Sequence, residues 1–484
     1  MGGSLRNAFF WSAVENLGLQ AIQFVISVTL ARLLSPQDFG LVGMLAIFLA
    51  IATIFSDAGL SLALVQRKEI SRDDETSVFL LNVAAAFAFV LLLWALSPAV
   101  ASFYRQPILK PMLRVSALAT VVASAGMVHS TLLNRQLAFR RSALISAPSA
   151  VIAGSVGIFM AWRGYGVWSL IGQGLALEIS RTTLLWVSLT WRPVGRFCWS
   201  SIRAMWGYSS KLLASSLLNS TFENIYPAVI GRFYPPAAVG DFTRANGLQW
   251  LPVRTTMGIV MRVTFPVLAR LQHDHELMKA ALRKMIRVVA AGFFPVMTGL
   301  SAAAWALVTA LLTPKWHGCV RYLQVLCFAG LLYPLHSFHL NVLMAGGRSD
   351  LFLRLEVIKK LLVVVMLVVT TPLGVYAMTW GILGISLLCY YINTHYTRKI
   401  LGYTFREQAA DTVPYLLISV SSGAAAWSAS LASVAGPWAR LAVQALAGAG
   451  VYALGVAIFR RSLYADVLRV AREMLAKYVG RRSA

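Results

Sequence analysis

The chain has 484 residues, of which 58% are hydrophobic and only 13% are charged, and its formal net charge is +25. Its mean hydropathy of +0.69 is too high for a soluble protein and is typical of a polytopic membrane protein. Lys and Arg stand in short clusters between apolar runs, so the charge does not indicate a nucleic-acid-binding protein. The four cysteines have no zinc-type spacing, and we expect neither a disulfide framework nor a metal site.

Apolar stretches of membrane-spanning length, separated by Pro, Gly or charged residues, predict about fourteen transmembrane helices. We therefore expect an all-α, multi-pass membrane protein. The first stretch has no small-residue cleavage site after it and is interpreted as a retained span, not as a signal peptide. The stretches are residues 8–33, 40–64, 77–103, 111–133, 143–162, 165–190, 206–231, 239–267, 281–312, 320–344, 352–371, 375–398, 412–434 and 438–460.

The distribution of Lys and Arg predicts the orientation of these spans. If the N-terminus is cytoplasmic, most of the 43 basic residues fall in cytoplasmic connections, including the clusters at 67–72, 135–141 and 270–287. This bias predicts that both termini are cytoplasmic. The basic tail at 461–484 has two open interpretations, a helix that lies on the anionic inner leaflet or a frayed end that only fixes topology.

A segment at residues 30–44, LARLLSPQDFGLVGM, returns in degenerate form 200 residues later. Arg32, Pro36 and Gly40 match Arg232, Pro236 and Gly240 with a single offset. Weak internal repeats of this kind are found in duplicated transporters. We predict two pseudo-symmetric six-helix bundles, at 1–200 and 201–400, followed by an additional helix pair at 401–460.

Further strings in the first 200 residues are DAGL at 57–60, ALVQR at 63–67, AFRR at 138–141 and GYGVWSL at 164–170. Together with the segment at 30–44, they resemble the Wzx-type flippases of lipid-linked oligosaccharides. These belong to the multidrug/oligosaccharidyl-lipid/polysaccharide exporter superfamily, and the resemblance is strongest to its colanic-acid-exporter-like branch. The second half matches more loosely, through FYP at 233–235, GDF at 240–242 and GVY at 374–376.

The resemblance implies a V-shaped pair of bundles in the bacterial inner membrane. It implies that the chain flips undecaprenyl-pyrophosphate-linked repeat units by alternating access, for exopolysaccharide or lipopolysaccharide biosynthesis. The expected partners are the lipid-linked glycan, membrane lipids and, in the export machinery, a polysaccharide polymerase; no nucleic acid and no cofactor are expected. Since no Gly-Lys dipeptide occurs, ATP hydrolysis is not expected, and H+ or Na+ coupling is the expected energy source.

The chain is expected to be a transporter and not an enzyme. Two other functional classes stay open. One is a membrane-embedded polysaccharide polymerase or ligase, against which stands the lack of a large periplasmic loop for a catalytic site. The other is an exporter of drugs or peptidoglycan precursors on the same scaffold. The number of arginines inside the predicted spans favours an anionic substrate over a cationic drug.

A glycan linked through pyrophosphate needs cations that face an aqueous cavity, because a charge facing lipid at mid-bilayer costs at least about 2.5 to 3.5 kcal/mol. Glu178 and Arg181 are three residues apart and share one helical face, and so do Arg254 and Arg262, which are eight apart. Arginine suits phosphate because its planar fork bonds two oxygens. The alternatives are a local ion pair between Glu178 and Arg181, and an Arg262 that extends to the cytoplasmic surface.

Polar residues in other spans are further candidates. Asn16 and Gln20 share a face of the first span. They are expected either to form a wall that hydrogen-bonds sugar hydroxyls or to make polar contacts with a neighbouring helix. Glu223, Asp57 and Glu15 are the candidates for coupling to H+ or Na+. For Asp57 the alternative is a cap of a tight helix end beside Gly59, and for Glu223 it is neutralisation by an arginine. The helically spaced His336 and His339 are interpreted as packing residues and not as metal ligands.

Overall fold

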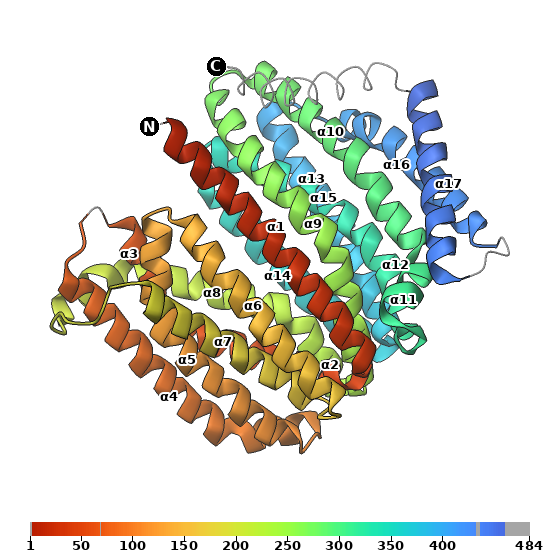
Figure 1. Ribbon diagram of the computed structural model, residues 1–484. Helices are drawn as coiled ribbons and strands as arrows, with labels where there is room; N and C mark the ends of the chain where they lie inside the picture. The colour runs from red at the N-terminus through yellow and green to blue at the C-terminus, as the bar shows by residue number, and fades with distance from the viewer. Residues whose placement is uncertain (1, 68, 432–435, 460–484) are drawn as a thin grey trace. The chain divides into compact units, whose positions relative to one another are not determined.

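The computed structural model describes the backbone of residues 2–67, 69–431 and 436–459, and their side chains except at residues 2–17, 259, 262, 263, 349 and 459. Throughout this range the regular structure is helical, with no strand, so the expected all-α fold is confirmed (Figure 1). The expected basic tail at 461–484 lies outside the described residues.

Each predicted span coincides with one helix or with two consecutive helices. Within the described residues, eight stretches are long and apolar enough to cross a membrane, while the count of fourteen spans stays a prediction. The α-helices are α1 (Gly2–Leu33), α2 (Pro36–Asp57), α3 (Leu60–Gln66), α4 (Arg72–Tyr104), α5 (Leu109–Arg135), α6 (Phe139–Trp162), α7 (Trp168–Ser188), α8 (Trp199–Phe233), α9 (Pro236–Arg270), α10 (His275–Ala302), α11 (Ala304–Leu312), α12 (Gly318–Leu331), α13 (Tyr333–Ala345), α14 (Ser349–Thr370), α15 (Val375–Leu401), α16 (Phe405–Ala429) and α17 (Pro437–Phe459).

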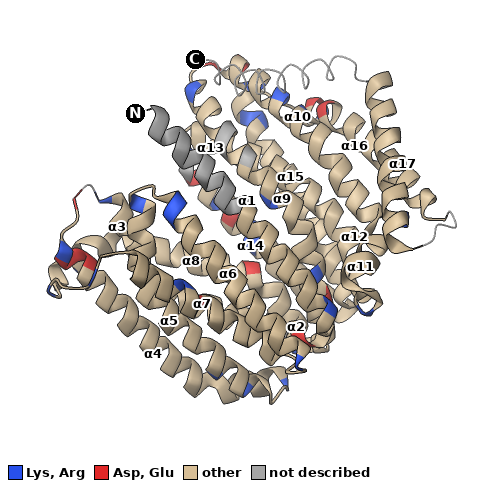
Figure 2. Ribbon diagram, viewed as in Figure 1, with Lys and Arg blue, Asp and Glu red and all other residues tan. Residues whose placement is uncertain are grey.

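Charged residues are concentrated near helix ends, as Figure 2 shows. Helix α4 is the clearest case, since it has three acidic residues in its first turn and none of Asp, Glu, Lys or Arg from Thr76 to Tyr104. This pattern fits an apolar middle that faces lipid and ends that meet polar headgroups and water.

The chain forms two compact units, Met1–Thr243 and Arg244–Ala484. The bundle boundaries predicted at residues 200 and 400 stay a prediction. In the first unit, α5 packs against α4 and α7, α6 packs against α7 and α1, and α8 packs against α2 and α4. A buried apolar cluster joins α3, α4, α5 and α8, and its members include Leu60, Leu64, Val78, Val128, Ile202 and Met205.

The two copies of the sequence repeat form two similar helix junctions. In the first, α1 ends at Leu33, and α2 begins at Pro36 with a capping box between Ser35 and Asp38. In the second, α8 ends at Phe233 and α9 begins at Pro236. Proline suits the first turn of a helix because it has no N–H to leave unpaired there.

These two junctions pack directly on each other within the first unit. A Cβ atom on Gly40 would lie 1.7 Å from the carbonyl oxygen of Pro236, and one on Gly240 would lie 1.9 Å from that of Pro36. The contact is reciprocal, because the glycine of each copy lies against the proline carbonyl of the other copy. Glycine is required at both positions because any side chain would overlap with the backbone of the other helix.

In the second unit, α10 packs against α12 and α16, α15 packs against α12, α13 and α14, and α16 packs against α17. Basic residues on successive turns of α10 face acidic residues of α16. Lys279 Nζ lies 2.9 Å from Glu407 Oε1, while Arg283 Nε and Arg287 Nε each lie 2.7 Å from oxygens of Asp411. The Lys279 ammonium, with the N–H of Thr404, lowers the pKa of Glu407 to about 2, which keeps this carboxylate ionised.

Candidate functional site

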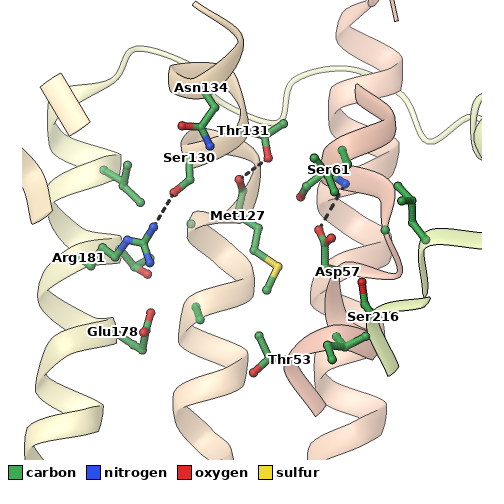
Figure 3. Close-up of a pocket in the computed structure, with 18 of the residues that line it drawn as sticks. Thr53, Asp57, Ser61, Met127, Ser130, Thr131, Asn134, Glu178, Arg181 and Ser216 are labelled. Carbon is green, nitrogen blue, oxygen red and sulfur yellow. Dashed lines mark hydrogen bonds between the residues drawn. The ribbon is translucent and has the colours of Figure 1, made fainter. Parts of the chain in front are cut away.

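A cavity of about 440 Å³ lies inside the first unit, between α2, α3, α5, α7 and α8 (Figure 3). It brings together three charged residues predicted from the sequence, Asp57, Glu178 and Arg181. The rest of its polar lining carries hydroxyl or amide groups, and these residues are Thr53, Ser61, Ser130, Thr131, Asn134, Thr182 and Ser216. The lining thus offers one cation, two carboxylates and many neutral hydrogen-bonding groups.

Helix α7 is held on α5 by contacts that fix the direction of its polar face. Thr182 Oγ1 donates a hydrogen bond to the Val122 carbonyl at 3.0 Å, and Trp186 Nε1 donates one to the Ala125 carbonyl at 2.9 Å. At Gly126, a Cβ atom would meet Leu185 and Thr182 at 3.0 and 3.1 Å, so the two helices approach closely there. Since residues three apart share a face, both Glu178 and Arg181 line the cavity.

The hydrogen bond of the Arg181 guanidinium goes to α5 and not to Glu178, its neighbour on α7. Arg181 Nη2 donates to Ser130 Oγ at 3.5 Å, as the dashed line in Figure 3 shows. Glu178 makes no hydrogen bond or ion pair with any described residue. Glu178 and Arg181 therefore form no direct ion pair, although their charges attract each other through space, and the Arg181 guanidinium keeps donors for a ligand.

Asp57 is the last residue of α2, where the chain turns into α3. Ala58 and Gly59 have φ angles of 48° and 73°, so the backbone is left-handed at both, and the Asp57 Oδ1 atom accepts a hydrogen bond from Ser61 N at 3.3 Å. A Cβ atom on Gly59 would lie 2.7 Å from the Ser209 carbonyl oxygen of α8. The carboxylate thus caps a tight helix end and lines the cavity as well.

The other predicted candidates do not line this cavity. Gln20 on α1 and Glu223 on α8 are exposed, and their roles stay predictions. Arg254 belongs to the second unit, where its guanidinium lies 6.0 Å from the centre of the Trp250 ring. The side chains of Glu15, Asn16 and Arg262 lie outside the described residues.

The sequence interpretation missed the polar wall that α5 contributes through Ser130, Thr131 and Asn134. The available signal was that Ser130 and Thr131 lie inside the predicted span at 111–133 and Asn134 directly follows it, since polar groups within a span usually face a cavity or another helix. His336 and His339 pack on α15, through Ser386 and Asn393 for the first and Thr397 for the second. No group of potential metal ligands occurs among the described residues.

The fold is similar to that of solved membrane transporters. It superposes on the inward-facing conformation of a multidrug resistance MATE family transporter of the MOP superfamily with a TM-score of 0.60, at 14% sequence identity, covering 78% of this chain and 94% of that one. A MATE transporter of Vibrio cholerae gives a TM-score of 0.52 at 13% identity, covering 83% and 97% of the two chains. The chain therefore has the fold of a MATE-type membrane transporter.

A family model described as "Polysaccharide biosynthesis protein" matches residues 29–321, and the chain belongs to this family. It is 26% identical to the lipopolysaccharide biosynthesis protein WzxC of Escherichia coli over 85% of this chain and 86% of the relative. It is also 26% identical to the succinoglycan biosynthesis transport protein ExoT of Rhizobium meliloti (84% and 80%) and to the teichuronic acid biosynthesis protein TuaB of Bacillus subtilis (70% and 71%). The resemblance found from the sequence is confirmed.

Proposed function

We propose that this chain moves undecaprenyl-pyrophosphate-linked oligosaccharide repeat units from the cytoplasmic to the periplasmic leaflet of the bacterial inner membrane by alternating access. The observation that carries the proposal is the cavity of the first unit, in which Arg181 faces a wall of hydroxyl and amide groups. The names of the relatives, which refer to lipopolysaccharide, succinoglycan and teichuronic acid, support a polysaccharide pathway.

The chemistry of the cavity fits the polar part of such a substrate. A guanidinium bonds two phosphate oxygens at once, and its hydrogen bonds to an anion are stronger than those between neutral groups. Ser130, Thr131 and Asn134 donate and accept hydrogen bonds, as sugar hydroxyls do. A carrier with these groups binds the diphosphate and the adjoining sugars while the polyprenyl chain stays in the lipid.

We further propose that both termini are cytoplasmic and that the cycle is coupled to H+ or Na+. The proposed partners are membrane lipids and the polymerase that uses the exported units. The distribution of basic residues supports the orientation. Asp57 and Glu178 are the two carboxylates that line the cavity, and they are the proposed sites of this coupling.

The experiment is complementation of a strain that lacks this gene with variants of Arg181. Arg181→Ala is expected to reduce surface polysaccharide about tenfold or more, because a hydrogen bond to a charged group contributes about 1.5 to 3 kcal/mol. Arg181→Lys is expected to be intermediate, since it keeps the charge and loses the fork.

The matched control is Arg163→Ala, which removes an exposed arginine from the connection between α6 and α7. It is expected to export as the wild type does. All variants are compared at equal abundance in the membrane fraction. Full complementation by Arg181→Ala would contradict the role of the cavity as the anion site.

A further inference from the structure

The charges in the cavity do not suit an anion by themselves. Among the described lining residues, only Asp57, Glu178 and Arg181 carry charge, so two carboxylates outnumber one guanidinium. With all three ionised, the net charge of the lining is −1. A diphosphate that enters such a lining meets net repulsion, which is strong where water is scarce.

The two carboxylates are engaged differently. Asp57 is fixed at the helix end, where its carboxylate accepts the Ser61 N–H. Glu178 is half-buried, has neither a hydrogen bond nor an ion pair with a described residue, and lies one turn from Arg181 on the same face of α7. Its negative charge makes no direct contact but attracts the Arg181 guanidinium through space, and it therefore opposes the binding of an anion there.

Apart from Asp57 on α2, the described lining on the other helices around Glu178 is uncharged. Helix α5 contributes Ser130, Thr131 and Asn134, and α8 contributes Ser216 with leucines. Helix α2 contributes Thr53 besides Asp57. A change of charge at Glu178 is thus not offset by a second cation, and these hydroxyl and carboxylate oxygens suit a hard cation such as Na+.

We propose that Glu178 takes up one univalent cation, H+ or Na+, when the anionic head group binds at Arg181, so that cation and substrate each raise the affinity of the site for the other. Neutralising Glu178 changes the net charge of the lining from −1 to 0 and leaves the Arg181 guanidinium to the diphosphate. Such a coupling is reciprocal by thermodynamic necessity. This inference rests on the proposed function, because it takes the diphosphate site to be this cavity.

The test measures binding of farnesyl diphosphate, a soluble isoprenyl diphosphate, to the full-length protein in lipid nanodiscs by calorimetry. One series varies pH at fixed Na+, and a second varies Na+ at fixed pH. If the cation is H+, affinity falls by up to about tenfold for each pH unit over which Glu178 ionises. If it is Na+, affinity rises with Na+ at constant pH.

The decisive variant is Glu178→Gln, which has nearly the shape of the protonated side chain. It is expected to bind the probe at least as tightly as the wild type under its best conditions, and to lose the dependence on both pH and Na+. The matched control is Glu69→Gln, an exposed carboxylate between α3 and α4, which is expected to keep the dependence of the wild type. Retention of a cation dependence by Glu178→Gln, or its absence in the wild type, would overturn the inference.

Arg181→Gln separates this inference from the proposed function. The variant is expected to lose binding of the probe under all conditions. If Arg181→Gln binds as the wild type does, or if the wild type does not bind the probe, the proposed diphosphate site is wrong and the inference fails with it. If binding depends on Arg181 and is indifferent to pH and Na+, only the inference about Glu178 is wrong.

Discussion

Arg181 and Gly40 show how single residues define this protein, the first by its charge and the second by having no side chain. The sequence predicted Asp57, Glu178 and Arg181 as functional candidates because a charge inside an apolar span is costly and needs a reason. It did not predict that they share one cavity, since only the packing of α2, α5 and α7 brings them together. The hydroxyls of Ser130 and Thr131 gave a weaker signal, because such residues are common in membrane helices.

At the residue scale, we predict that Gly40→Ala and Gly240→Ala each destabilise the protein. An added methyl group would overlap with a backbone carbonyl that has no freedom to rotate away, and overpacking typically costs about 1 to 3 kcal/mol. Thermal unfolding of the purified variants, followed by gel filtration, measures the loss.

The control is Gly247→Ala in the same helix α9, where an added Cβ has no atom within 4 Å. This variant is expected to unfold at the temperature of the wild type or slightly above it, since alanine is a better helix former. Wild-type stability for both Gly40→Ala and Gly240→Ala would show that the two junctions do not pack as described.

At the scale of elements, helix positions followed from apolar length, while the breaks between consecutive helices did not. The stretch at 40–64 was expected as one span, but the chain ends α2 at Asp57 and starts α3 at Leu60. The break depends on a left-handed Ala58, which a non-glycine residue adopts only when its surroundings impose it. The local sequence therefore indicated a turn at Gly59, but it did not indicate that Ala58 also adopts the left-handed conformation.

At the scale of elements, our prediction concerns the packing of α16 against α10. Asp411 is nearly buried, with 2% of its side chain exposed, and it accepts hydrogen bonds from Arg283, Arg287 and the Tyr403 hydroxyl. We expect Asp411→Asn to destabilise the contact by about 2 kcal/mol, because it leaves Arg287 without its anion and leaves Arg283 with only the longer ion pair to Glu407, at 3.8 Å. Hydrogen exchange of the α16 backbone should become faster than in the wild type.

Asp350→Asn is the matched control, since Asp350 pairs with Arg348 while 64% of its side chain is exposed. Exposed pairs contribute little to stability, and no change in α16 exchange is expected. Equal protection of α16 in the wild type and in Asp411→Asn would mean that apolar packing alone holds this helix.

At the scale of the whole molecule, the internal repeat is the feature of the sequence from which the arrangement of the helices was predicted. The offset of 200 residues between two short motifs predicted two related bundles, which stays a prediction, while the fold itself is similar to that of a MATE transporter. The reciprocal contact of Gly40 and Gly240 gives the repeat a physical meaning, because both copies supply the same surface to one junction.

The central claim is tested most directly by the location of lipid-linked repeat units in a strain that lacks this gene. Spheroplasts of that strain are treated with a glycosidase that cannot cross the membrane, and the surviving lipid-linked glycan is measured. We predict that the units accumulate and are protected from the enzyme, because they stay in the cytoplasmic leaflet. Digestion of accumulated, unpolymerised units at the periplasmic face would contradict this account and would assign the chain to a step after translocation.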